Sequence, residues 1–249
     1  MNIENSQFSV KNKRFEITKY GIKILCCVFM AFDHAALIVP SPKLTLILRA
    51  IPRPFFVVIP LMLAEGYKHT SNLPKYMTRL FIFALVTQPF YCFFFNYALA
   101  WPYRLNAMFT LFLGLMCMYV WDTARHKWFA ALFCALTAYL GQICNVEGGA
   151  WLVIFTFMFR LITDGKRKFV VSYSALYVGN YLPSILKSAL KHDRGGLLKN
   201  MLYLFCALWG ALLIFFYNGR QGRRGGYFFY IFYPAHLALL GAITLLINE

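Results

Sequence analysis

The stretch YGIKILCCVFMAFDHAALIV, residues Tyr20–Val39, indicates the fold class of this chain. It is long enough to cross about 30 Å of hydrocarbon as a helix. It also places an aspartate and a histidine, Asp33 and His34, inside a largely apolar run. Two ionisable groups at membrane depth are costly unless partners or water meet them, and such groups usually belong to a functional site. The stretch therefore predicts a membrane-spanning helix that carries the site.

The rest of the sequence has the same character. Of its 249 residues, 60% are hydrophobic and only 14% are charged, with a mean hydropathy of +0.58. This is far from the composition of soluble domains. We expect an all-α, polytopic integral membrane helix bundle of about nine transmembrane helices. The expected spans are Tyr20–Val39, Pro54–Tyr67, Tyr76–Asn96, Tyr103–Trp121, Trp128–Cys144, Ala150–Thr163, Phe169–Leu190, Leu197–Tyr217 and Tyr227–Ile247.

The domain organisation is expected to be simple. Residues 1–19 are polar, and no small-residue cleavage site follows the first apolar run, so this run is predicted to be a retained helix and not a signal peptide. Residues 1–19 are predicted to be a cytoplasmic segment and residues 20–249 a single transmembrane domain, because no linker divides the chain.

The net charge of +16 would suggest nucleic acid as the partner of a soluble protein. Here most basic residues fall between the expected spans, in loops that share one side of the membrane. The positive-inside rule then predicts a cytoplasmic N-terminus and a C-terminus outside. The loop Lys187–Lys199 breaks this pattern, with four basic residues on the outer side. Membrane lipids, and no nucleic acid, are the partners that this distribution predicts.

The seven cysteines all lie within apolar runs, without a CxxC motif and without a histidine at metal-ligand spacing. They are expected to be buried thiols. The sequence predicts no metal site.

Asp33 and His34 need partners from other segments, because neighbouring side chains on a helix point about 100° apart. Arg49 and Arg53 are spaced i,i+4 just before the second expected span, at the end of the first helix nearest Asp33. An arginine paired with Asp33 would satisfy the carboxylate and leave His34 free.

Further polar residues fall within or beside the expected spans: Glu65, Arg79, Gln88, Asn106 and His236. Together with Asp33 and His34 they extend over the whole membrane thickness, as the lining of a passage between both surfaces would. Each also has a simpler interpretation. In the simpler interpretation of each, His236 is a packing residue, Arg79 extends to lipid phosphates and Glu65 faces water at a helix end. The corresponding interpretation of Asp33 and His34 is a buried structural network.

The order of these residues resembles the TraX family. The resemblance rests on DHAALI (Asp33–Ile38), LN..FTL..GL (Leu105–Leu115) and FYPAHLALLG (Phe232–Gly241), which includes Tyr233. It extends to two scattered motifs, whose residues are Arg49, Arg53, Glu65, Gly66 and Tyr67, and then Thr70, Tyr76, Arg79, Leu80, Phe83, Ala84, Gln88 and Pro89. Family members usually differ at Pro52 and Val57, and their glycine-rich turn is reduced here to Asn145–Gly149.

The resemblance implies an inner-membrane enzyme, multi-pass and bacterial, that transfers acetyl from acetyl-CoA to the N-terminal α-amino group of pilin or a similar membrane-anchored acceptor. A neutral imidazole suits the proton transfer that such a reaction needs, and His34 is the predicted base. Asp33 is expected to stabilise the imidazolium through a bridging group, or to hold Arg53. Asn106 or Arg53 is the expected donor to the oxyanion, and Arg79 the expected contact to the phosphates of acetyl-CoA.

Two other classes of protein fit the same residues. Intramembrane acids and histidines also form the proton relays of transporters, although no paired inverted halves are apparent in the sequence. A non-catalytic assembly factor for pili or another envelope machine is the second alternative.

Overall fold

The fold is known from a computed structural model that describes residues 17–95, 104–161, 166–216, 220 and 226–248. Most of the predicted segment 1–19 lies outside these residues. The described residues form ten helices and no β-strand, which confirms the all-α class. The helices are α1 (Lys19–Ala35), α2 (Pro42–Ala50), α3 (Phe55–His69), α4 (Leu73–Phe95), α5 (Ala107–Thr123), α6 (Lys127–Ile143), α7 (Gly149–Leu161), α8 (Lys166–Leu190), α9 (Arg194–Phe216) and α10 (Phe228–Asn248).

Nine of these helices coincide with the nine expected spans, and α2 was not expected. Ser41 caps α2 by accepting a hydrogen bond from the backbone N–H of Leu44, and Pro42 occupies its first turn. Both are typical start signals. With nine residues, α2 is too short to cross a membrane, so a search for long apolar runs misses it. Its last turn carries Arg49.

Two of the described helices are long and apolar enough to cross a membrane, α4 and residues Phe228–Ile247 of α10. Helices α5, α6 and α7 are apolar but have only 17, 17 and 13 residues. A bundle of nine spans is therefore not confirmed by the described part of the chain.

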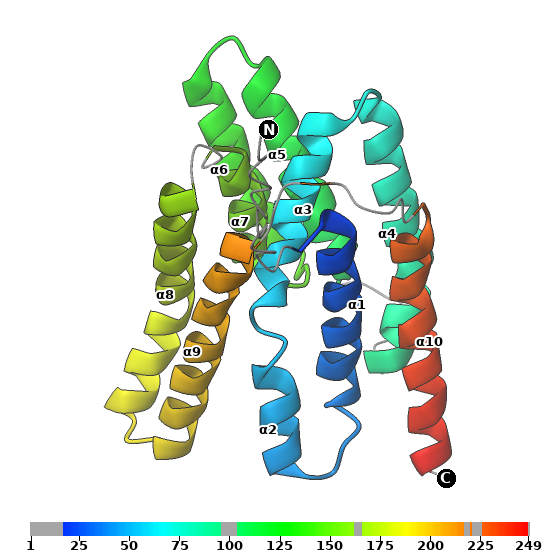
Figure 1. Cartoon of the computed structure of the whole chain (residues 1–249), viewed down its shortest axis with the longest axis vertical. Helices are drawn as coiled ribbons and strands as arrows, with labels where there is room; N and C mark the ends of the chain where they lie inside the picture. Colours follow the sequence, from blue (N-terminus) through cyan, green and yellow to red (C-terminus); the bar gives the residue numbers. More distant parts are fainter. Residues whose placement is uncertain (1–16, 96–103, 162–165, 217–219, 221–225, 249) are drawn as a thin grey trace, which may run out of the picture.

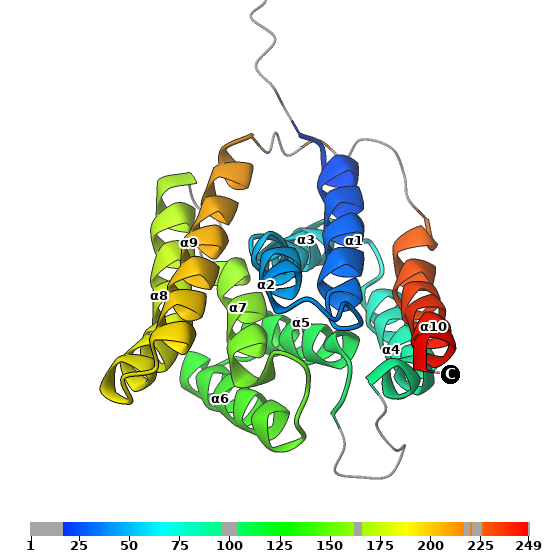
Figure 2. The ribbon, with the colours of Figure 1, turned by 90° about the horizontal axis from the view of Figure 1, so that it is seen from below.

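Most helices run up or down the view of Figure 1, but Figure 2 shows α1, α8 and α9 lengthwise as well, so these helices are inclined to the long axis of the molecule. The α3–α4 and α5–α6 connections lie at the upper end of this view, and the α1–α2 connection, the α8–α9 turn and the C-terminus lie at the lower end. The α8–α9 turn, which lies within the basic segment Lys187–Lys199, is thus at the opposite end of the molecule from the α3–α4 and α5–α6 connections (Figure 1). Viewed from below, the α8–α9 pair forms one flank and the α4–α10 pair the other, with α1 and α3 between them (Figure 2).

The main apolar core lies where α1, α3 and α5 meet. Ile22, Val58, Leu115 and Met118 are each at most 2% exposed. On the α4–α10 flank, Gly241 permits close packing, because a Cβ there would overlap the ring of Phe93. This contact sets the position of α10, which carries Tyr233 and His236, against α4 and the rest of the bundle.

Candidate active site

The Asp33 carboxylate forms ion pairs with both predicted arginines. Its Oδ1 lies 3.3 Å from Arg53 Nη2 and 3.6 Å from Arg49 Nε. Arg53 is fixed in turn, since its Nε donates to the backbone oxygen of Arg49 at 2.7 Å and its guanidinium lies over the rings of Phe56 and Tyr203. The side chain of Asp33 is 7% exposed. The structure thus brings these three residues together as predicted, at the junction of α1, α2 and α3.

His34 faces a different partner and is not left free. Its Nδ1 lies 2.7 Å from Nε2 of His236 on α10, and the two ring planes are inclined by only 6°. Both imidazoles are buried, and His34 also contacts the rings of Phe94 and Phe95. Asp33 and His34 therefore lie on different faces of α1, one toward the arginines and one toward α10.

The hydrogen bonds of His236 determine where the protons lie when both rings are neutral. The second ring nitrogen of His236, Nδ1, lies 2.9 Å from the backbone oxygen of Phe232. A carbonyl oxygen only accepts, so Nδ1 carries the proton and Nε2 of His236 is an acceptor. His34 must then donate through Nδ1–H, and its Nε2 bears a lone pair. Among the described residues, Nε2 of His34 has no hydrogen-bond partner.

Asn106 is fully buried and its amide is completely engaged. Its Nδ2 donates to the backbone oxygen of Ala84 at 2.8 Å and to Oε1 of Gln88 at 2.9 Å, while its Oδ1 caps α5 by accepting from the N–H of Met108. Both N–H groups that an oxyanion would need are thus occupied. The predicted oxyanion role of Asn106 does not fit this geometry, and Gln88 likewise serves to hold Asn106.

A second cluster of polar groups surrounds Glu147, which lies in the turn between α6 and α7. The Tyr233 hydroxyl donates to Glu147 Oε2 at 3.0 Å and accepts from the backbone N–H of Ala107 at 3.4 Å. The ring of Tyr233 lies beside both imidazoles, with centroids 6.4 Å from His34 and 5.6 Å from His236. Burial raises the pKa of the Glu147 carboxyl, whereas nearby Arg104 and the Tyr233 hydroxyl lower it.

One cavity of about 480 Å³ joins these groups. This volume lies within the range of small-molecule sites, about 300–1,000 Å³. It extends along α1 from Lys23 to His34, which is roughly 16 Å at the helical rise of about 1.5 Å per residue. The charged residues that line it, among those described, are Lys23, Asp33, Arg49, Arg53, Arg104 and Glu147. His34 and Tyr233 also line it, whereas His236 lies behind His34 and does not.

Two predicted site residues lie near the other end of α1 and do not line this cavity. Glu65 pairs with Lys19, whose Nζ is 3.6 Å from Glu65 Oε2. Arg79 lies over the rings of Tyr76, Tyr227 and Tyr230 at 5.1–5.8 Å from their centroids. Tyr76 and Tyr230 line the cavity near Lys23, so Arg79 is one layer behind its wall.

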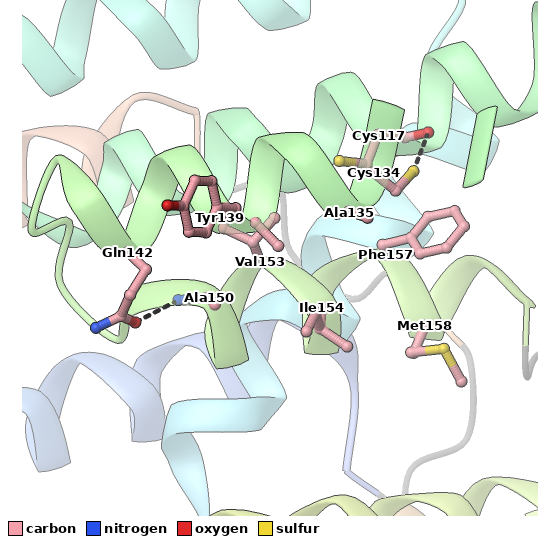
Figure 3. Close-up of a pocket in the computed structure, with 11 residues that line it drawn as sticks. Cys117, Cys134, Ala135, Tyr139, Gln142, Ala150, Val153, Ile154, Phe157 and Met158 are labelled. Atoms are coloured by element: carbon pink, nitrogen blue, oxygen red, sulfur yellow. Dashed lines mark hydrogen bonds between the residues drawn. The ribbon is translucent and has the colours of Figure 1, made fainter. Parts of the chain in front are cut away.

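A second cavity, of about 520 Å³, lies among α5, α6 and α7 (Figure 3). Its lining is almost wholly apolar, with Val153, Ile154 and Phe157 on α7. The two polar contacts drawn there, from Cys134 Sγ to the oxygen of Cys117 and from the N–H of Ala150 to Gln142, connect groups of the protein itself (Figure 3). No histidine, carboxylate, lysine or arginine is among the described residues that line this cavity.

The sequence interpretation missed three charged residues of the first cavity: Lys23, Arg104 and Glu147. Lys23 lies within the first expected span and Glu147 within the reduced turn Asn145–Gly149, and the sequence interpretation assigned neither to a site. A signal for Glu147 existed, since few acidic residues lie between apolar runs in this chain. Its position inside the cavity depends on how the α6–α7 turn packs against residues 104–107, which no local pattern reveals.

Fold and site together define a helical protein with buried ionisable groups around one central polar cavity. The chain belongs to the TraX family, since residues 19–244 match the family described as TraX protein. It is also similar to a protein of Dichelobacter nodosus named "Probable fimbrial assembly protein FimC, serogroup H1", with 26% identity over 245 residues, 92% of this chain and 96% of the relative. No solved structure matches the chain.

Proposed function

We propose that this protein is an integral membrane acetyltransferase that moves acetyl from acetyl-CoA to an amine. The observation that carries the proposal is the state of His34. It lines the cavity, donates its only proton to His236 and keeps a lone pair on Nε2. A neutral imidazole with a free lone pair is suited to act as a general base near neutral pH.

The proposed reaction needs one proton acceptor and one anion-stabilising group. The neutral amine nitrogen attacks the thioester carbonyl carbon, and a C–N bond forms while the C–S bond breaks. His34 Nε2 takes the N–H proton and then gives it to the departing sulfur, so that an amide and a thiol result. His236 accepts from the imidazolium through Nε2 and supports its charge, as the third member of a triad does. Arg53 remains as the predicted donor to the oxyanion.

The charges of the cavity favour an anionic acyl donor. Of the residues that the structure describes, four cationic and two acidic side chains line it, and two of the cations, Arg49 and Arg53, share the single carboxylate of Asp33. Lys23 lies toward the end where the cytoplasm is predicted, with Arg79 behind the wall beside it. The phosphates of acetyl-CoA would bind at that end, and the thioester would extend toward His34.

Membrane residence at the bacterial inner membrane, with several spans, is part of the proposal. It is supported by α4 and α10, which are long and apolar enough to cross a bilayer. The outward face of α6 also supports it, since Trp128, Leu132, Leu136 and Ile143 are each at least 50% exposed. Such a face is costly in water but matches lipid chains.

Pilin is the acceptor that we propose. The support is the family, and the printed name of the relative, which describes it as a fimbrial assembly protein. A pilin subunit anchored in the bilayer would present its N-terminal amine at membrane depth, where His34 is expected.

Purified protein in lipid bilayers, given labelled acetyl-CoA and an apolar peptide with a free N-terminus, tests the proposal. Wild-type protein should label the peptide, and His34→Ala should lower the rate by about 10²–10⁴-fold. The matched control is His126→Ala, because His126 is exposed in the α5–α6 turn. Absence of transfer by a folded wild-type protein, or full activity of His34→Ala, would refute it.

A non-catalytic assembly factor is the second candidate, favoured by the name of the relative. Such a factor would support pilus formation equally well with His34→Ala, provided that the variant inserts. A proton-coupled transporter would instead show proton flux that depends on substrate and is lost with the same variant.

A further inference from the structure

Glu147 is a second charged centre of the same cavity that the proposed reaction does not use. Its turn is held in a fixed position. The N–H of Glu147 donates to the oxygen of Leu105 at 2.8 Å, and the backbone oxygen of Glu147 accepts from Thr110 Oγ1 at 2.6 Å. Asn145 in the same turn has φ of 52°, a conformation that non-glycine residues rarely adopt. Gly148 follows at φ of 80°, and a Cβ there would overlap Leu152.

The carboxylate so placed lines the same cavity as the predicted base, His34. Tyr233 connects the two, because its hydroxyl donates to Glu147 Oε2 while its ring lies beside the imidazoles of His34 and His236. One hydrogen bond leaves a carboxylate with several further lone-pair sites. A cationic group bound to Glu147 would therefore sit near Tyr233 and within the same cavity as the lone pair of His34.

An amine acceptor requires an acidic side chain in this cavity to bind its ammonium form. An α-amino group has a pKa of about 7.7–8.0 and is mostly ammonium at neutral pH. The cationic excess of the lining repels an ammonium, and the two arginines already occupy Asp33. Within the described part of the chain, Glu147 is the other acid of the lining. A fixed carboxylate there offers the charge-assisted hydrogen bond that an ammonium requires.

We infer that Glu147, held by Tyr233, binds the ammonium group of the acceptor and so selects amines over hydroxyl acceptors. The inference rests on the proposed function, because it names how the acceptor of the same site is recognised. The ammonium form itself does not attack the thioester. Acetyl transfer proceeds from the fraction of bound acceptor that has released one proton to water and is a neutral amine. The competing interpretation is that Glu147 serves only to balance the charge of Arg104.

The test measures binding of two peptides to the full-length protein in lipid nanodiscs, without acetyl-CoA. One apolar peptide carries a free N-terminal amine and its twin is N-acetylated. Wild-type protein should bind the free amine about 10- to 100-fold more tightly, the usual range for a hydrogen bond to a charged group. Glu147→Gln should abolish this preference while leaving affinity for the acetylated twin unchanged. Asp122→Asn is the matched control, since Asp122 pairs with Arg160 away from the cavity.

Tyr233→Phe provides a second variant that keeps the carboxylate but removes its hydrogen bond, and it should reduce the preference. A wild-type protein without preference for the free amine, or a preference that survives both variants, overturns the inference. Measurements of acetyl transfer distinguish failure of this inference from failure of the proposed function. Acetyl transfer with an unchanged KM for the peptide in Glu147→Gln refutes only the amine site. A Glu147-dependent preference without any transfer refutes only the acetyltransferase.

Discussion

His34 and His236 are 202 residues apart in the sequence, yet their ring nitrogens lie 2.7 Å from each other in nearly parallel planes. The pair joins the end of α1 to the middle of α10. Because the backbone oxygen of Phe232 accepts from Nδ1 of His236, the hydrogen bond between the two rings has a defined direction: His34 donates and His236 accepts. The remaining lone pair, on Nε2, belongs to His34, which lines the cavity.

His236 is expected to act through His34 and not on substrate. In His236→Leu the imidazolium of His34 loses its acceptor, and acetyl transfer should fall by about 10²-fold or more, within the range for acid–base groups. His236→Gln retains an acceptor oxygen and should keep intermediate activity. The rates of peptide acetylation, at equal amounts of folded protein, decide this order. Equal losses in both variants would show that His236 only fills space.

Asp33 is expected to stabilise the fold through Arg49 and Arg53. Asp33→Asn leaves two guanidinium groups without their counter-ion and should lower the free energy of unfolding by about 3 kcal/mol, the low end for breaking a buried ion pair. The low end applies because the side chain of Arg49 is 36% exposed. Denaturant titration in detergent measures the change.

The double variant Asp33→Asn/Arg53→Met should recover part of that stability, because it removes one of the unpaired charges. Asp193→Asn, in the exposed α8–α9 turn, is the control and should change stability far less. Additive losses in the double variant would argue against direct coupling between Asp33 and Arg53.

Asn106 is expected to be a structural residue. Asn106→Ala removes the cap of α5 and leaves Gln88 and the oxygen of Ala84 without their partner, so stability should fall by about 2–3 kcal/mol. Asn72→Ala removes an exposed cap to Lys75 and should cost about 1 kcal/mol. Thermal unfolding compares the two. A fully stable Asn106→Ala without acetyl transfer would restore a direct role for this amide.

Arg79 is expected to contribute to binding of acetyl-CoA. Arg79→Ala should raise the KM for acetyl-CoA about tenfold with little change in kcat, and the effect should weaken at high salt, because charges near a surface are screened. Arg125→Ala removes an exposed charge from the α5–α6 turn and serves as control. If both variants change KM equally, only the overall charge of that end matters. An unchanged KM would make Arg79 a packing residue among its tyrosines.

Local patterns accounted for much of the fold. The nine apolar runs became helices, because their length and composition leave helix as the way to satisfy the backbone in an apolar environment. The search for apolar runs missed α2, which has a clear Ser-Pro start but only nine residues, too few for a span. The pairing of Asp33 with Arg49 and Arg53 was also predictable, because the chain that connects them is short and the charges are opposite.

Long-range neighbours were not predictable in the same way. The i,i+4 rule assigns faces within one helix but says nothing of which helix packs against that face. His34 was expected to be free and meets His236 instead, and Asn106 was expected at the reaction and caps a helix. Glu147 enters the cavity only because the α6–α7 turn is bonded to Leu105 and Thr110.

The sequence by itself determined that this chain is helical and that ionisable groups lie within apolar surroundings, since both follow from which residues stand next to one another. The tertiary structure alone decided which of those groups share a cavity and which nitrogen of His34 keeps its lone pair. Those properties depend on contacts between residues far apart in the chain, namely the packing of α10 against α4 and α1 and the bonding of the α6–α7 turn to Leu105 and Thr110.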